Sequence, residues 1–272
     1  MIHIDHLKKS YDSFTLDCSL DIPKGIITGI IGMNGAGKST LFKSILDINP
    51  IDEGNIQIPD KQDIGVVLSE TGFSEFFTVS DIISILKCTY KRFDEDLFHS
   101  YCQRFDIPLD KKTRTFSTGM KAKLNIIIAL THHAKLLILD EPTAGLDVLT
   151  RDEILDILRD YMEQEDCTIL ISSHISSDLE SLCDALYVID HGQIIMHEEM
   201  DTLLSQYGVL KVSKEDYDNL DKDYLLEVMK EPFGYSCLTN VKQFYSENYP
   251  TIVIEQNHID TMIPILLKGE RL

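Results

Sequence analysis

The amino-acid sequence predicts an α/β fold in which a mostly parallel β-sheet carries helices on its faces. Short apolar runs that are typical of buried strands alternate with segments in which apolar residues recur at helical spacing. A glycine-rich stretch follows one such run, and two adjacent carboxylates end another. Strands and helices that alternate along a chain usually form a parallel sheet, and ligands bind beyond the carboxyl ends of its strands. We therefore expect both features to lie at the ligand-binding edge of the sheet.

The chain begins with an antiparallel β subdomain and continues into the sheet. Residues 1–22 predict two strands around a turn at 8–13, and residues 25–31 predict a fully buried strand. A helix with apolar residues at helical spacing begins near Leu41. Further strands are expected at 56–58 and 64–68.

The stretch from about 70 to 133 predicts a helical insertion between two strands. Apolar spacing favours helices at 81–90, 94–105 and 120–130, with Ser80 and Asp81 as the cap of the first. The sheet then resumes. The expected strands and helices of this part are 135–142, 151–162, 168–172, 177–183, 185–190 and 192–196. These elements complete a main domain over residues 1–205.

The pattern changes near residue 206. Short strand-like runs at 209–212 and 251–255 are separated by an acidic segment at 214–229 that predicts helix, and residues 259–268 predict a last helix that contains Pro264. We expect residues 206–272 to form a small α+β accessory domain.

Composition excludes several classes of protein. The 272 residues are 43% hydrophobic, which is enough for a core, and the formal net charge is −20, which argues against a surface for nucleic acid. The six cysteines form no C-x-x-C pair, so a zinc site or a redox motif is not expected. No secretory leader and no apolar run of ~18 to 20 residues is present, so we expect a cytoplasmic chain that does not cross a membrane.

Residues 32–39 (GMNGAGKS) form a complete G-x-x-x-x-G-K-S motif. Glycines let the backbone curl so that its N–H groups converge on phosphate oxygens, Lys38 reaches the β- and γ-phosphates, and the Ser39 hydroxyl binds Mg²⁺. The preceding strand and the following helix are the context that this motif requires. The chain is therefore expected to be a P-loop NTPase. The residues expected around the nucleotide are Asn34, Gly35, Ala36, Gly37, Lys38, Ser39 and Thr40.

Asp140 and Glu141 end an apolar strand and are the second strong signal. Asp140 would hold Mg²⁺ directly or through water, and Glu141 could polarise an attacking water. The alternative for this pair is two solvated carboxylates at the end of a strand.

Together these motifs resemble the nucleotide-binding subunit of an ATP-binding cassette (ABC) transporter, over about residues 1–206. Residues 116–120 (FSTGM) are similar to the family signature, commonly LSGGQ, and keep its serine and second glycine as Ser117 and Gly119. Residues 144–147 (AGLD) resemble the D-loop, and His174 resembles the switch histidine. Tyr11 matches the aromatic residue that stacks on adenine in this family.

The resemblance implies a function and partners. ATP and Mg²⁺ would be bound at the P-loop, and Glu141, His174 and Lys38 would act in hydrolysis. Ser117 and Gly119 would contact the ATP of a second subunit in a head-to-tail homodimer. The dimer would drive a separate transmembrane permease from the inner face of the cell membrane. Within the family, the resemblance is closest to small bacterial exporters of peptides, toxins or antibiotics, such as those for phenol-soluble modulins.

One motif departs from the family pattern. Where a glutamine usually follows the strand at 64–68, this chain has Ser69 and Glu70, and either side chain could reach Mg²⁺ or its water. The aromatic residues just beyond, Phe73, Phe76 and Phe77, could pack in the core or could receive a helix of the membrane partner.

Two other functions remain open from the residues alone. The chain could be a soluble ABC ATPase that acts on a macromolecular assembly such as ribosomes or DNA. It could also be a nucleotide switch that does not hydrolyse ATP, although Glu141 argues against this.

Overall fold

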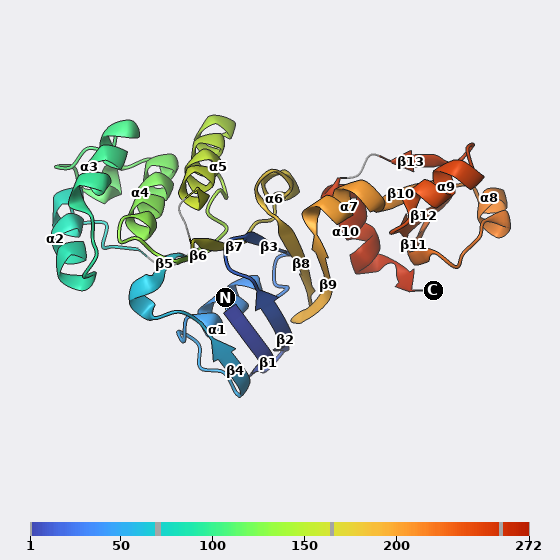
Figure 1. Ribbon diagram of the computed structural model, residues 1–272, viewed down its shortest axis with the longest axis horizontal. Helices are drawn as coiled ribbons and strands as arrows, with labels where there is room; N and C mark the ends of the chain where they lie inside the picture. Colours follow the sequence, from blue (N-terminus) through green and yellow to red (C-terminus); the bar gives the residue numbers. More distant parts are fainter. Residues whose placement is uncertain (1, 69–71, 164–165, 256–257, 272) are drawn as a thin grey trace.

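A computed structural model of the protein describes residues 2–68, 72–163, 166–255 and 258–271 (Figure 1). At its centre is a six-stranded sheet with the strand order β5-β6-β7-β3-β8-β9. Five strands are parallel, and β9 pairs antiparallel with β8. The strands are β3 (Ile27–Ile31), β5 (Ile64–Val67), β6 (Leu136–Asp140), β7 (Thr168–Ser172), β8 (Ala185–Asp190) and β9 (Gln193–Glu199). Every residue of β3, β6 and β7 is buried, as expected for a parallel sheet covered on both faces.

A second, antiparallel sheet lies beside the first, with the order β2-β1-β4. It consists of β1 (Ile2–Tyr11), β2 (Phe14–Ile22) and β4 (Glu53–Gln57). Buried and exposed residues alternate in β2, whose inner side chains pack with those of the helix α1 (Lys38–Ile45) in one core cluster. The turn expected at 8–13 is shorter than predicted, because β1 continues to pair with β2 as far as Tyr11 and Phe14.

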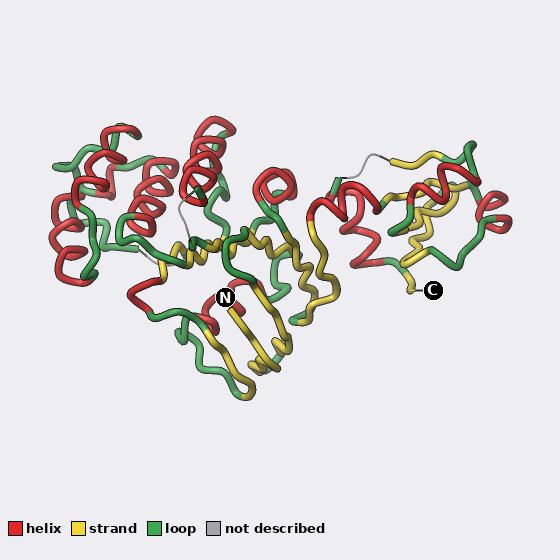
Figure 2. The backbone as a smooth tube through the Cα atoms, in the orientation of Figure 1, coloured by secondary structure: helices red, strands yellow, loops and turns green. Residues whose placement is uncertain are grey.

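The helices α2 (Val79–Thr89), α3 (Glu95–Arg104) and α4 (Thr118–Leu130) lie between β5 and β6 in the chain and gather at the β5 end of the sheet (Figures 1 and 2). The predicted cap of α2 is wrong by two residues. Thr78 is the N-cap and forms a capping box with Asp81: its hydroxyl accepts from the Asp81 N–H, and the Asp81 carboxylate accepts from the Thr78 N–H. Two short 3-10 helices accompany this group: Lys61–Asp63 precedes β5, and Thr113–Thr115 lies between α3 and α4. The helices α5 (Val148–Met162) and α6 (Ser176–Leu182) follow β6 and β7.

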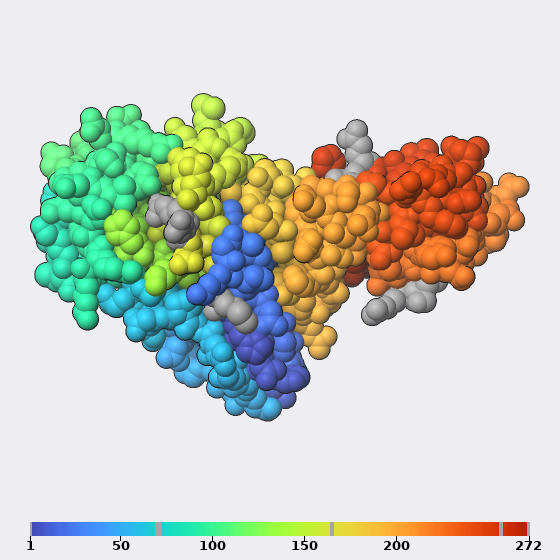
Figure 3. Space-filling view, viewed as in Figure 1, coloured from blue at the N-terminus to red at the C-terminus, as the bar shows by residue number. Residues whose placement is uncertain are grey.

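The last part of the chain forms a separate sheet with the order β13-β10-β12-β11-β14. Figure 3 shows this part, in orange and red, projecting from the rest of the molecule. Its strands and helices are α7 (Met200–Gln206), β10 (Gly208–Val212), α8 (Lys214–Asn219), β11 (Leu225–Glu231), β12 (Gly234–Thr239), α9 (Lys242–Asn248), β13 (Val253–Glu255), α10 (Ile259–Lys268) and β14 (Glu270–Arg271). The helix predicted across 214–229 is wrong in its second half, because residues 225–231 pair with β12 and with β14.

Gly192, in the turn between β8 and β9, joins three parts of the fold. Its N–H donates to the Ala36 carbonyl in the P-loop at 2.9 Å, and its carbonyl accepts from the Asp17 N–H of β2 at 2.8 Å. Its φ is 81°, and a Cβ placed there would lie 2.0 Å from the Thr15 carbonyl oxygen. Only glycine allows the two sheets and the P-loop to meet this closely.

Gly192→Ala and Gly25→Ala form a matched pair that tests this packing. Gly25 has a φ of 78° but nothing within 4 Å of its ideal Cβ. Both changes should cost the left-handed strain of about 1–2 kcal/mol, and only Gly192→Ala should add roughly 1–3 kcal/mol for the clash. Urea unfolding of both variants measures the difference. Equal losses of stability would show that the contact at Gly192 is not tight.

Candidate functional site

The loop between β3 and α1 curls as the sequence motif predicts. Gly37 is the N-cap of α1, and its φ of 116° is a conformation that other residues rarely adopt. The Ala36 N–H donates to the Met33 carbonyl at 3.0 Å, which closes a tight turn over the end of β3. The first N–H groups of α1 therefore face the same space as the loop, where an anion is favoured.

A cavity of about 510 Å³ opens over this loop. Eight of its lining residues are predicted site residues, and they come from the loop, from the end of β6 and from the segment after β7: Asn34, Gly35, Gly37, Lys38, Ser39, Thr40, Glu141 and His174. The other three are Phe14, Met33 and Ala144. The parallel sheet thus brings together motifs that lie far apart in the sequence.

Glu141 lies between Lys38 and His174. The Lys38 Nζ donates to the Gly32 carbonyl at 2.7 Å and lies 3.4 Å from Glu141 Oε1. The other carboxylate oxygen accepts from the His174 backbone N–H at 3.1 Å, and the His174 Nδ1 lies 2.5 Å from it. The Glu141 backbone is left-handed, with a φ of 53°, a strained conformation that recurs at functional sites. The three side chains form one connected polar group on the cavity wall.

Asp140, the last residue of β6, is buried beneath this group and is 1% exposed. Its Oδ1 accepts from the Ser172 hydroxyl at 2.7 Å, whereas its Oδ2 is buried and has no hydrogen-bond partner among the described residues. An unpaired carboxylate oxygen in the interior is costly unless a cation or its water compensates it. Together with the Ser39 hydroxyl on the cavity wall, it is the hard oxygen donor set that Mg²⁺ prefers.

Ser172 is a residue of the site that the sequence analysis does not single out. Its hydroxyl donates to Asp140 and also accepts from the Glu141 N–H at 3.0 Å, so that it orients both carboxylate residues. It is fully buried at the end of β7, next to β6. The signal in the sequence is a polar residue that ends an apolar strand.

The predicted signature residues lie away from this cavity. Ser117 is exposed and caps α4, where its hydroxyl oxygen accepts from the Met120 N–H at 3.2 Å. Gly119 packs against Thr150 of α5, which leaves little space for a larger residue. Asp147, at the end of the predicted D-loop, caps α5, and the hydrogen bonds from the Thr150 N–H and hydroxyl hold the pKa of its carboxyl below the usual value. None of residues 116–120 lines the cavity at Lys38.

The aromatic side chain at the cavity wall is Phe14, not Tyr11. The two rings face each other across the first hairpin with centroids 6.3 Å apart, and Tyr11 accepts a hydrogen bond from Asn49 at 3.1 Å. Phe14 could have been found from the short turn that places it opposite Tyr11. Ser69 and Glu70 lie outside the described residues.

Comparison with known proteins places this geometry in a family. The model of the family described as ABC transporter matches residues 16–144. The ABC transporter ATP-binding protein YtrB of Bacillus subtilis (strain 168) is 31% identical over 231 residues, which cover 81% of this chain and 79% of that protein. The chain belongs to the ABC transporter family. It is an ATP-binding and ATP-hydrolysing subunit, so the resemblance noted from its motifs is confirmed.

Two further comparisons agree. The lantibiotic transport ATP-binding protein SrtF of Streptococcus pyogenes is 35% identical over 212 residues, which cover 74% of this chain and 92% of SrtF. The solved structure of an ATP-binding subunit of an ABC transporter superposes with a TM-score of 0.68 over 76% of this chain and 92% of that one, at 24% identity. The predicted fold class, a P-loop NTPase with a mostly parallel sheet, is confirmed. Among the described residues, no helix has the length and apolar character needed to cross a bilayer.

Ser172→Ala tests how the acidic pair is positioned. The change removes the hydrogen bond to Asp140 and leaves both oxygens of a buried carboxylate unpaired, so the free energy of unfolding should fall by about 1–3 kcal/mol. Urea unfolding measures it. Ser100→Ala, which removes an exposed hydroxyl that donates to Leu97, is the control and should change stability little. An equal, small effect at both positions would mean that Ser172 does not hold Asp140.

Proposed function

We propose that this chain is the ATPase subunit of a bacterial ABC exporter, which works as a homodimer on a separate transmembrane permease at the inner face of the cell membrane. The observation that carries the proposal is the connected group Lys38, Glu141 and His174 on the wall of the P-loop cavity. It provides a phosphate-binding cation beside a carboxylate that is already oriented by an imidazole. Phosphoryl transfer to water needs this combination of charge and positioning.

Each group has a role in the proposed mechanism. Lys38 leaves Glu141 and binds the β- and γ-phosphates, which frees the carboxylate to accept a proton from the attacking water. His174 keeps Glu141 and the γ-phosphate aligned. Asp140 and the Ser39 hydroxyl would hold Mg²⁺, which offsets phosphate charge when it is bound. Phe14 offers an apolar surface at the cavity wall on the side of Tyr11.

The dimer completes the site in this proposal. The exposed N-terminus of α4, with Ser117 and Gly119, would bind the γ-phosphate held by the partner subunit, because free N–H groups at the start of a helix favour an anion. Ser117 is exposed, and residues 116–120 do not line the P-loop cavity of their own chain. Both observations support this arrangement.

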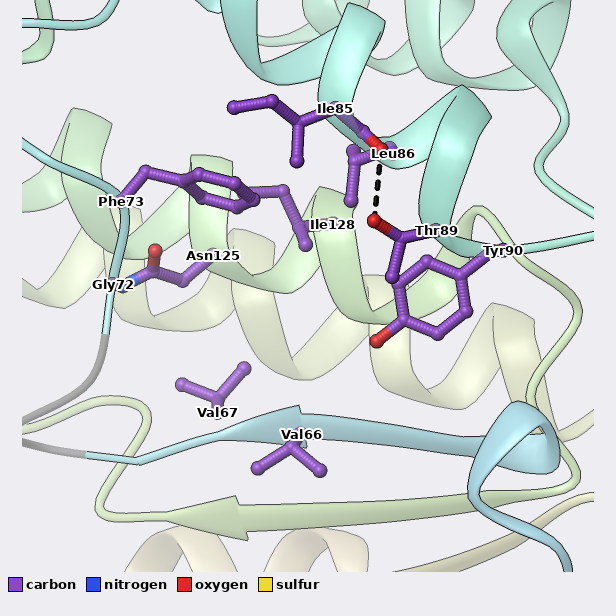
Figure 4. A pocket seen from close by; sticks show the side chains of 10 residues that line it. All are labelled: Val66, Val67, Gly72, Phe73, Ile85, Leu86, Thr89, Tyr90, Asn125 and Ile128. Atoms are coloured by element: carbon purple, nitrogen blue, oxygen red, sulfur yellow. Dashed lines mark hydrogen bonds between the residues drawn. The ribbon is translucent and has the colours of Figure 1, made fainter.

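The permease would dock beside α2 and α4. A largely apolar cavity of about 370 Å³ lies between these helices and β5, and the side chains of Phe73, Ile85 and Ile128 converge on it (Figure 4). Phe73 packs against the core, whereas Phe76 is 66% exposed and lies under the Arg114 guanidinium. This division supports a docking role for Phe76 and Phe77 and a packing role for Phe73.

The substrate class and the accessory domain are also proposals. The name of SrtF refers to lantibiotic transport, and we infer a peptide or antibiotic as the exported substrate of the present system. We also infer that residues 206–272 form an accessory domain on the cassette of residues 1–205.

Glu141→Gln tests the proposed base. The amide keeps the shape but cannot take a proton, so ATP should still bind, turnover should fall by about 10²-fold or more, and ATP-bound dimers should accumulate. Steady-state hydrolysis and gel filtration with ATP measure these effects. Glu95→Gln, a change at an exposed surface pair with Lys87, should leave both unchanged. Turnover that is unaffected in the Glu141 variant would rule out Glu141 as the base.

Phe76→Asp tests the docking surface. A charged residue at this exposed position should leave the isolated subunit folded and reduce its recovery with membranes that contain the permease by about tenfold, a loss typical of a central aromatic contact. Phe233→Asp, at a position that is 97% exposed in the C-terminal part, is the control and should not affect recovery. Unfolding of the Phe76 variant would favour a core role instead.

A further inference from the structure

The C-terminal helix α10 packs against α6, the helix that begins just after His174. Ile259, Met262 and Ile265 of α10 belong to the same buried cluster as Leu179 and Leu182 of α6. Figure 1 shows α10 reaching back from the C-terminal sheet towards α7 and the cassette. The core of the cassette therefore continues into residues that follow position 206.

Polar contacts fix this packing. The Asp260 carboxylate accepts a hydrogen bond from the Ser176 hydroxyl, at the first residue of α6, which is 2% exposed. Glu180 of α6 lies at the other end of the contact, where its Oε1 accepts from the Ile259 N–H at 2.5 Å and its Oε2 lies 3.2 Å from His258 Nδ1. A carboxylate at the N-terminus of a helix is favourable, so Glu180 stabilises α10 and joins it to α6.

The opposite side of α6 contacts two residues that flank the predicted D-loop, one just before it and one in α5. Asp178 is fully buried; its Oδ2 accepts from the Thr143 hydroxyl at 2.7 Å, and its Oδ1 lies 2.5 Å from Arg151 Nε. Thr143 precedes residues 144–147 and Arg151 follows them. The helix α6 is thus fixed between the residues that flank the predicted D-loop and the C-terminal helix.

The position of α6 determines where His174 lies. A helix of seven residues is too short to be stable alone, so its position depends on the contacts around it. His174 contacts Glu141 through its backbone N–H and through its ring, at 3.1 and 2.5 Å. A displacement of about 1 Å in a catalytic group can cost 10²-fold in rate.

We propose that Ser176, Glu180 and Asp260 are positioning residues for His174, so that the C-terminal domain sets the rate of ATP hydrolysis in its own chain. These residues do not touch the P-loop cavity. The loss of their contacts therefore lowers turnover and leaves ATP binding intact. This inference rests on the role of His174 proposed above.

Asp260→Ala and Asp260→Asn test it in the full-length protein. Alanine removes the acceptor of the Ser176 hydroxyl, and asparagine keeps an oxygen at that place. We expect kcat for ATP hydrolysis to fall about tenfold in the alanine variant and to stay within about twofold in the asparagine variant, with KM for ATP unchanged in both. Asp223→Ala, at an exposed position in the same C-terminal part, is the matched control. Equal kcat in all three variants would overturn the proposal, and so would a change confined to KM.

Amide hydrogen exchange gives a second readout that does not depend on activity. In Asp260→Ala, exchange at His174 and along residues 176–182 should accelerate at least tenfold, while the amides of residues 33–40 keep their rates. Unchanged exchange at His174 would contradict the proposal. Faster amide exchange over the whole chain would show a general loss of stability instead of a loss of positioning. That result would also contradict the proposal.

His174→Ala separates this inference from the proposed function. If turnover survives His174→Ala, the proposed role of His174 fails. If His174→Ala lowers kcat and Asp260→Ala does not, only the positioning role fails. If both roles are correct, the double variant with His174→Ala and Asp260→Ala should have the same kcat as His174→Ala alone, since the two changes remove the same effect.

Discussion

The contact of Glu141 with Lys38 on one side and His174 on the other is the interaction on which the functional part of the structure depends. It joins three segments: the P-loop after β3, the end of β6 and the segment after β7. The strands β6, β7 and β3 are neighbours in the central sheet. Both oxygens of one carboxylate are thereby engaged by groups from the two neighbouring segments. In the proposed mechanism, a bound triphosphate competes with Glu141 for Lys38, so nucleotide binding would release Glu141.

The surrounding fold maintains this arrangement. The buried parallel strands fix the ends from which the three residues project, and Ser172 holds Asp140 and Glu141 in register at the end of β6. Gly192 connects the P-loop to the antiparallel sheet. On the far side, α6 follows His174 and receives contacts from α5 and from α10. The P-loop cavity is therefore linked to the C-terminal part of the chain by a short series of contacts through Glu141, His174 and α6.

Much of the cassette could be predicted from the sequence, because its signals are local. The P-loop needs glycines and a lysine at fixed spacing, and buried parallel strands are continuous apolar runs, so β3, β6 and β7 were predicted close to their true bounds. Predictions failed where pairing with a distant strand decided the outcome. Residues 225–231 have helix-forming acidic neighbours but form β11, since β12 and β14 lie on either side of them. The contacts of Ser172 and of Asp260 could not be predicted, because they join residues far apart in the chain.

The central claim is that the nucleotide site is complete only when two chains meet, with Lys38 and Glu141 from one chain and Ser117 from the other. Complementation tests it most directly. A Lys38→Ala chain and a Ser117→Arg chain should each hydrolyse ATP poorly, and their mixture should recover activity, because a mixed dimer contains one site with an intact P-loop and an intact opposing Ser117. A Ser117→Arg chain that hydrolyses ATP at the wild-type rate, or a mixture no more active than its components, would contradict the account.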